Sequence, residues 1–181
     1  MKRLSIIVPI YNVEPFVERC LISLETQDIP HEEYEIICIN DGSPDGSRDI
    51  VLCMQKNYEN IILIDQENQG VSRARNNGID HARGKYLLFI DPDDYVDANC
   101  FGSILSSIEE SEAQVSFLGY TILNEDGTVR QTMFYEQYLG KIYLGTAAYF
   151  ITHMTGSPDP DRTAAVLLDS NFLNSNILRY L

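Results

Sequence analysis

Four short apolar runs, separated by segments with helical spacing, constrain the fold of this chain more than any other feature. They cover residues 4–10, 35–40, 61–64 and 86–90. The runs are too short for ordinary helices and are rich in branched residues, which indicates buried strands. Because strands that alternate with helices usually form a parallel sheet, the sequence predicts an α/β fold with a mainly parallel central sheet.

Apolar residues at helical spacing predict four helices between and after these strands. They begin at Pro15, at Ser47, after Gly70 and at Asn99. Phe16 and Val71 belong to the apolar faces of the first and third helices, which predicts that they pack on the core. We expect Gly84 to end the third helix as a C-terminal cap.

The pattern changes after residue 112. Strand-like stretches at residues 115–123 and 128–135 flank a glycine turn and predict a β-hairpin. Helices are expected over residues 144–154 and 171–176, with a loop at residues 155–162. A length of 181 residues suits a single domain. We therefore expect one domain with two regions, residues 1–112 and 113–181.

The fourth apolar run ends in Asp91-Pro92-Asp93. In an extended backbone, residues two apart point to the same face, so we expect the two carboxylates to aim at one point. Carboxylates suit Mg²⁺ or Mn²⁺, and ligands of open α/β sheets bind beyond the carboxyl ends of strands. Asp91 and Asp93 are therefore a candidate metal site. A turn without function is the alternative for this stretch taken alone.

Three further side chains stand near predicted strand ends or helices. Tyr11 could stack on a planar base or pack on the core. Asp41 could accept hydrogen bonds from a base or ribose, or satisfy the backbone of the turn that follows it. Arg75 could reach a phosphate or be a solvated helix charge. Because the ends of parallel strands converge at one edge of a sheet, these residues could line one pocket.

The charge balance limits the classes of ligand. Acidic residues outnumber basic ones by 27 to 13, for a formal net charge of −14. Without a basic cluster, the sequence argues against nucleic acid as a partner. An anionic ligand would need a cation to mediate its binding. No run of eighteen apolar residues is present, so no transmembrane segment is predicted.

The cysteines and the absent motifs further limit the cellular compartment and the enzyme classes that fit the sequence. Four widely spaced cysteines predict buried, reduced thiols, which fit a cytoplasmic protein; they are Cys20, Cys38, Cys53 and Cys100. No G-x-G-x-x-G motif, P-loop or G-x-S-x-G elbow is present. The phosphohydrolase pattern D-x-D-x-[TV] fits the acidic pair but fails at Tyr95.

Four motifs together resemble the family-2 glycosyltransferases of the GT-A fold, a Rossmann-like fold of nucleotide-diphospho-sugar transferases. They are SIIVPIYN at residues 5–12, NDGSPDGS at 40–47, ENQGVSRARNNGI at 67–79 and FIDPDDY at 89–95. The resemblance covers about the first hundred residues, with the motifs in the family's order. It implies a hexosyltransferase-like enzyme that moves a sugar from a nucleoside diphosphate, expected to be UDP, to an acceptor hydroxyl with inversion. Surface polysaccharide or glycan synthesis is the implied process.

The resemblance also assigns residues to the donor. It implies that Pro9 and Tyr11 frame the nucleotide base and that Asp41 holds the edge of the uracil ring. Asn68 and Arg75 would contact the remainder of the donor. These roles follow from the family's motifs.

The resemblance makes the acidic pair the family's D-x-D motif. Asp91 and Asp93 would bind Mg²⁺ or Mn²⁺, with Asp93 as the better ligand, and Asp91 would also contact the donor. The acidic motif that supplies the family's catalytic base is not reached, so the base is expected beyond Leu181. Asp159 and Asp161 are weak candidates for the same role.

On this interpretation, residues 1–112 bind the nucleotide sugar, and residues 113–181 form part of the acceptor side, apparently truncated. The acceptor would be a glycan or a lipid-linked molecule. We expect a cytoplasmic protein, either free or peripherally attached to the inner face of the membrane. One alternative is a nucleotide-sugar-binding remnant without transfer activity. The other is a sugar-nucleotide nucleotidyltransferase or phosphohydrolase, which would want a basic phosphate loop near the first strand.

Overall fold

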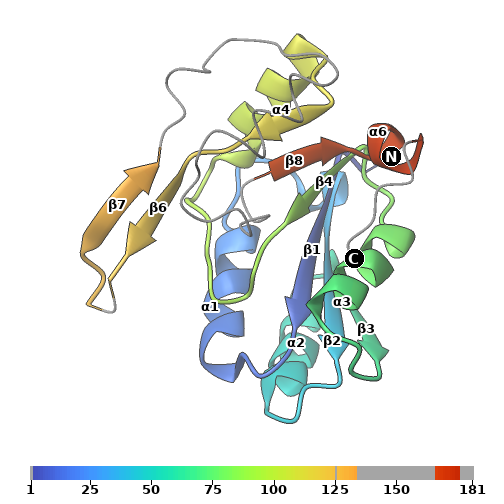
Figure 1. Cartoon of the computed structure of the whole chain (residues 1–181), viewed down its shortest axis with the longest axis vertical. Coiled ribbons are helices and arrows are strands. Elements are labelled where there is room, and N and C mark those ends of the chain that lie inside the picture. The colour runs from blue at the N-terminus through green and yellow to red at the C-terminus, as the bar shows by residue number, and fades with distance from the viewer. Residues whose placement is uncertain (1, 125, 134–165, 176–181) are drawn as a thin grey trace.

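The computed structural model describes residues 2–124, 126–133 and 166–175, which are organised around one six-stranded sheet (Figure 1). The four predicted strands form its parallel part: β1 Leu4–Ile10, β2 Tyr34–Asp41, β3 Ile61–Gln66 and β4 Tyr86–Phe89. They lie in the order β3-β2-β1-β4, and each neighbouring pair is parallel. The expected α/β fold with a mainly parallel sheet is confirmed.

Helices cover both faces of this sheet. They are α1 Glu14–Glu25, α2 Ser47–Gln55, α3 Val71–His81 and α4 Phe101–Ser111, with a short 3-10 helix, η1, at His31–Glu33. α1, α2 and α4 share a core with Ile6 and Val8 of β1, whereas α3 packs on the opposite face against Ile7. Because successive strand residues point to opposite faces, β1 serves both layers.

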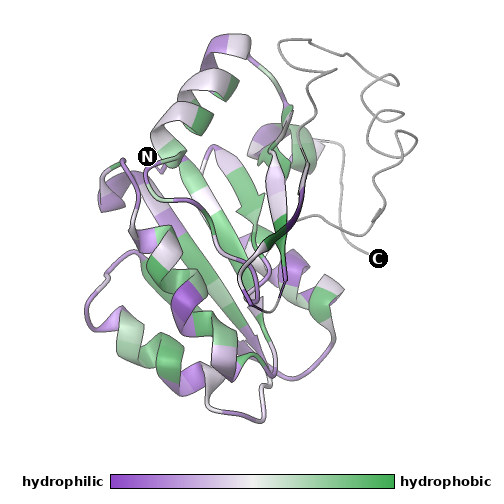
Figure 2. Ribbon diagram, turned by 90° about the vertical axis from the view of Figure 1, so that its left-hand side faces the viewer, coloured by the Kyte–Doolittle hydropathy of each residue, from purple (hydrophilic) through white to green (hydrophobic). Residues whose placement is uncertain are grey.

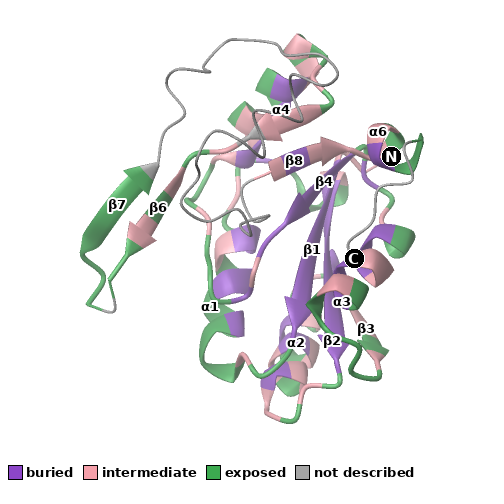
Figure 3. Cartoon of the chain, in the orientation of Figure 1, coloured by how far each residue is buried: buried purple, intermediate pink, exposed green. Residues whose placement is uncertain are grey.

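The layering explains why the predicted strands lack polar alternation. Figure 2 shows hydrophobic residues concentrated along the central strands, and Figure 3 shows β1, β2 and β4 buried throughout. A strand covered by helices on both sides needs apolar residues on both faces. In the described part of the chain, no helix has the length and apolar character needed to cross a membrane.

Gly84 does not cap α3, so that prediction is wrong. The helix ends at His81, and Ala82 follows in an extended conformation. Gly84 instead passes close to β1, where its N–H donates to Ser5 Oγ at 2.8 Å. A Cβ at this position would lie 2.4 Å from the Ser5 nitrogen. The glycine is therefore required by a close backbone approach and not by a helix end.

The region after residue 112 adds β5 and β8 to the same sheet and forms a separate two-stranded sheet from β6 and β7. Its elements are β5 Val115–Phe117, β6 Tyr120–Leu123, β7 Val129–Met133, β8 Val166–Asp169 and α6 Ser170–Ser175. β6 and β7 form the predicted hairpin, but β5 leaves it and pairs with β8, which was not predicted. β8 lies antiparallel between β4 and β5. The helix and loop expected over residues 144–162 lie outside the described residues.

The cysteines are free thiols, of which Cys20 and Cys38 are buried and Cys100 is partly buried. Burial raises the pKa of Cys20 to about 12. Cys53 is exposed, so the prediction of burial is wrong there. α2 turns Ser47, Val51 and Met54 to the interior, which leaves Cys53 on its outer face.

The carboxylate of Glu25 is buried at the edge of the sheet where β2 begins. Its Oε2 accepts a hydrogen bond from the Tyr34 hydroxyl at 3.2 Å and lies 3.2 Å from His31 Nε2. Burial raises the pKa of Glu25, against the opposing effects of His31 and Tyr34. A raised pKa in the folded state gives stability at low pH that is lost as the pH rises through it.

We therefore expect Glu25→Gln to raise the melting temperature at pH 8 by a few degrees, at about 2–4 °C for each kcal/mol gained. The gain should shrink at pH 4, because the native carboxyl group is then protonated. Thermal unfolding of both proteins from pH 4 to pH 8 measures this. A gain that is independent of pH would show that ionisation of Glu25 is not its cause.

Candidate functional site

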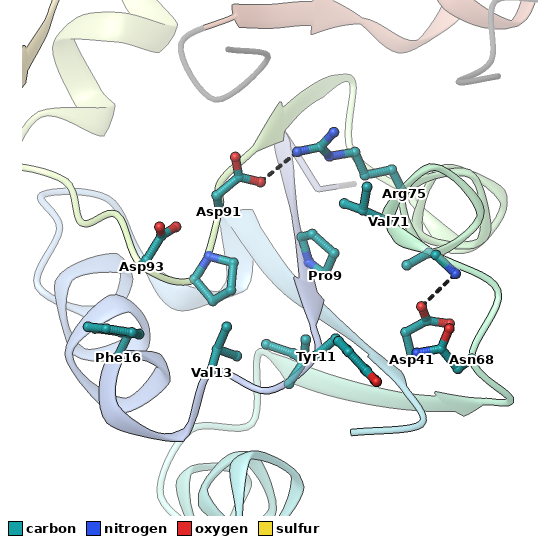
Figure 4. Close-up of a pocket in the computed structure, with 14 residues that line it drawn as sticks. Pro9, Tyr11, Val13, Phe16, Asp41, Asn68, Val71, Arg75, Asp91 and Asp93 are labelled. Atoms are coloured by element: carbon teal, nitrogen blue, oxygen red, sulfur yellow. Dashed lines mark hydrogen bonds and ion pairs between the residues drawn. The ribbon is translucent and has the colours of Figure 1, made fainter. Parts of the chain in front are cut away.

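A pocket of about 450 Å³ opens where the carboxyl ends of β1, β2 and β4 meet the start of α3 (Figure 4). Every donor and metal residue expected from the sequence lines it: Pro9, Tyr11, Asp41, Asn68, Arg75, Asp91 and Asp93. The predicted convergence at one sheet edge is therefore observed, as parallel strands require. The roles of these residues in binding remain predictions. Asp159 and Asp161, the weak candidates for the catalytic base, lie outside the described residues.

The loop after β1 is fixed to the loop after β2. The backbone N–H of Asn12 donates to Ser43 Oγ at 2.8 Å, and that of Glu14 donates to Asp45 Oδ2 at 2.9 Å. Burial acts to raise the pKa of Asp45, but hydroxyl and backbone donors outweigh it and hold the pKa well below its usual range. Tyr11, half-exposed on the pocket wall, is thus carried by a loop with a defined backbone.

Asp41 is buried at the end of β2, with only 2% of its surface exposed. Its carboxylate accepts hydrogen bonds from the backbone N–H groups of Gln69 and Gly70, both at 2.8 Å, and from Gln66 Nε2 at 2.7 Å. The backbone that it satisfies is therefore the loop before α3 and not the turn that follows Asp41. Oδ2 accepts one of these three bonds, so it has capacity for one more donor from a ligand.

Arg75 reaches from α3 across the sheet edge to the end of β4. Its Nη2 lies 2.6 Å from Asp91 Oδ1, and Figure 4 shows the two side chains pointing toward each other. Only 11% of the Arg75 side chain is exposed, so it is not a solvated helix charge. The pair places a positive charge beside the acidic residues of the pocket.

The backbone of the acidic pair is a turn and not an extended strand. The Asp94 N–H donates to the Asp91 carbonyl at 2.9 Å, which closes a β-turn with Pro92 and Asp93 at its centre. The extended backbone expected for this segment is therefore wrong, although both residues line the same pocket. Asp91 turns to Arg75, while Asp93 is exposed at the pocket and, among the described residues, makes no side-chain hydrogen bond or ion pair.

The donor set fits a hard divalent cation that a ligand helps to hold. Within the described ranges, no group of three or more His, Cys, Asp or Glu side chains could enclose a metal ion. Mg²⁺ commonly binds through one or two carboxylates and completes its shell with water and substrate phosphates. The uncommitted carboxylate of Asp93, with Asp91 beside it, satisfies that requirement.

The apolar part of the pocket was not predicted as such. Phe16 and Val71 were expected in the core, but both are exposed and line the pocket, and Val13 joins them. Helical periodicity cannot separate a core contact from a pocket wall, because both use an apolar side chain on the inner face. The available signal was position, since each residue lies in or just before the first turn of a helix that follows a strand.

Comparison with known proteins identifies the family of this chain. The model of glycosyl transferase family 2 matches residues 5–161. The uncharacterized glycosyltransferase EpsJ of Bacillus subtilis is 44% identical over 116 residues, which cover 64% of this chain and 33% of the relative. The poly(ribitol-phosphate) beta-glucosyltransferase of Bacillus spizizenii is 36% identical over 136 residues, which cover 74% and 21%. The chain thus spans a third or less of these two relatives.

A solved structure shares the fold over nearly the whole chain. TarS 1–349 of S. aureus, in complex with UDP, superposes with a TM-score of 0.77 at 24% identity. The match covers 99% of this chain and 50% of TarS 1–349. The expected GT-A fold is confirmed by this likeness.

Proposed function

The chain belongs to glycosyl transferase family 2, and we propose that its pocket binds a nucleoside diphosphate sugar whose sugar is transferred with inversion to an acceptor hydroxyl. The observation that carries the proposal is that three kinds of functional group line one pocket. Asp41 offers a buried acceptor, Arg75 a buried cation and Asp93 an uncommitted carboxylate. These match the base, the diphosphate and the divalent cation of such a donor.

The base end of the donor would lie near Asp41 and Tyr11. The remaining acceptor capacity of Asp41 suits a ring N–H, which uracil carries at its N3 position. Tyr11 presents an aromatic ring and Pro9 an apolar surface on the same wall. UDP is therefore the nucleotide that we propose, and the binding of UDP by TarS supports it.

The diphosphate end would lie between Arg75 and the acidic turn. Arg75 can donate charge-assisted hydrogen bonds to phosphate oxygens. Asp93, with Asp91, would hold Mg²⁺ or Mn²⁺, which when bound supplies Lewis-acid stabilisation of the negative charge that develops on the leaving diphosphate. Such a cation also reconciles an anionic donor with a chain of net charge −14.

The acceptor belongs to the same proposal. One relative is named a poly(ribitol-phosphate) glucosyltransferase, which supports a glycan or polyol-phosphate acceptor in surface polysaccharide synthesis. Residues 1–112 would then form the donor side and residues 113–181 part of the acceptor side. The catalytic base stays a prediction, with Asp159 and Asp161 as weak candidates within this sequence.

Calorimetry of UDP binding tests the proposal directly. We expect UDP to bind in Mn²⁺ and to lose most of its affinity in chelator, with Asp93→Asn abolishing the metal-dependent part. Asp49→Asn, an exposed substitution on α2 outside the pocket, is the matched control. Equal affinity with and without metal would refute the metal role, and no UDP binding under either condition would refute the donor site.

Discrimination between bases tests Asp41 separately. We expect Asp41→Asn to weaken UDP binding by about 1–3 kcal/mol and to reduce the preference for UDP over CDP. An asparagine amide can donate as well as accept, and cytosine lacks the N3–H that a carboxylate would bind. The ratio of the two affinities is the informative measurement, because a disturbed 66–70 loop would weaken both nucleotides equally. An unchanged ratio would show that Asp41 does not contact the base.

A further inference from the structure

One face of α1 holds the irregular segment that follows β4. Arg19 Nη2 donates to the carbonyl oxygen of Asp93 at 3.0 Å. One helical turn later, Ser23 Oγ accepts a hydrogen bond from the N–H of Val96 at 3.1 Å. Residues four apart lie on the same helix face. Side chains of the helix therefore hydrogen-bond to the backbone on both sides of Tyr95.

The same line of contacts continues past the end of α1. Gln27 Nε2 donates to the Asp97 carbonyl at 2.9 Å, and its Oε1 accepts from the N–H groups of Cys100 and Phe101 at 3.0 and 3.3 Å. Residues 90–100 form no helix or strand. Side chains from α1 and from Gln27, two residues after its end, thus supply hydrogen bonds that regular structure would otherwise give this segment.

Arg19 makes a second contact with the segment that carries Asp93. Its guanidinium carbon lies 4.7 Å from the centre of the Tyr95 ring. The residue thus binds the backbone of Asp93 and the side chain two positions later. The Asp93 carboxylate has no side-chain partner among the described residues, so its location depends on how firmly this backbone is held.

We propose that Arg19 is a positioning residue that holds the Asp93 carboxylate where it can share a divalent cation with the donor diphosphate. The inference rests on the proposed function for the metal, whereas the hydrogen bond from Arg19 to the Asp93 backbone does not depend on that function. Arg19 touches neither base nor phosphate site in the pocket lining. Its contribution is to the location of Asp93.

The sign of one measurement separates positioning from simple electrostatics. Arg19 carries a positive charge next to an acidic turn, so its charge alone would oppose the binding of a cation. If charge were its only influence, Arg19→Gln would tighten Mn²⁺ binding. Positioning predicts the opposite, because a partner that orients a metal ligand typically contributes about 10- to 100-fold to metal affinity.

Two readouts on the full chain test the inference, with Arg19→Gln and Arg19→Lys as variants. In Arg19→Gln, amide hydrogen exchange at Asp94 and Val96 should accelerate, and the affinity for UDP in Mn²⁺ should fall about tenfold. Affinity for UDP in chelator should stay unchanged. Arg19→Lys keeps the charge and one donor, so it should recover part of the loss.

The outcomes distinguish this inference from the proposed function. Unchanged amide exchange, or equal or tighter Mn²⁺-dependent binding in Arg19→Gln, would overturn the positioning role. If Arg19→Gln loosens the segment but the unmodified chain binds UDP without metal, the metal part of the proposed function fails, and the role of Arg19 toward a cation fails with it. Faster exchange combined with weaker metal-dependent binding supports both.

Discussion

Arg83→Ala is expected to lower the free energy of unfolding by about 3 kcal/mol, the lower end of the range for removing one partner of a buried ion pair. Glu35 is fully buried in β2, and its carboxylate accepts hydrogen bonds from Arg83 Nη2 at 2.7 Å and Nε at 3.0 Å. The Arg83 side chain is itself 66% exposed. Removal of the Arg83 side chain leaves the Glu35 carboxylate without its positively charged partner, although water can then approach from the vacated side.

Chemical denaturation measures this loss of stability, and two further variants serve as controls for its cause. Arg48→Ala breaks an ion pair with Asp65 in which both side chains are more than 40% exposed, so it should cost much less than Arg83→Ala. Adding Glu35→Gln to Arg83→Ala removes the buried unpaired charge and should restore part of the lost free energy of unfolding. Equal costs for Arg83→Ala and Arg48→Ala would contradict the argument.

This pair illustrates what the sequence could and could not predict. Periodicity placed Glu35 at the start of a buried strand, as found, but its partner lies 48 residues further along the chain. The strand β8 was missed for the same reason, because a four-residue run becomes a strand only when β4 and β5 flank it. Local patterns predict elements, whereas long-range pairing selects their partners.

The candidate site shows the same division. Its residues converge because parallel strands end at one edge, which the alternation of strands and helices already implied. The error at Asp91 and Asp93 was local: Pro92 favours the second position of a β-turn, so the backbone turns where an extended segment was expected. The hydrogen bond from Arg19 to Asp93 joins residues 74 positions apart, and no sequence motif predicts it.

Arg75→Gln is expected to weaken UDP binding in Mn²⁺ by about 10- to 100-fold, from the 1.5–3 kcal/mol typical of hydrogen bonds to charged groups. It should also tighten the binding of Mn²⁺ alone. In the free protein, Arg75 occupies Asp91 Oδ1 at 2.6 Å and so competes with a cation for that carboxylate. With a nucleotide present, the same guanidinium is available to the phosphates. One substitution should thus shift the two affinities in opposite directions.

Uridine and Arg73→Gln make this expectation specific. Uridine lacks the diphosphate, so Arg75→Gln should leave its affinity unchanged, and a parallel loss would indicate a disturbed base site instead. Arg73 lies on the same helix with the same charge, but it is exposed and outside the pocket lining. Its substitution changes the net charge by the same amount and should affect neither Mn²⁺ nor UDP. If Arg73→Gln reproduced the effect, long-range charge would explain it, and the Arg75–Asp91 pair would not be the switch between cation and phosphate.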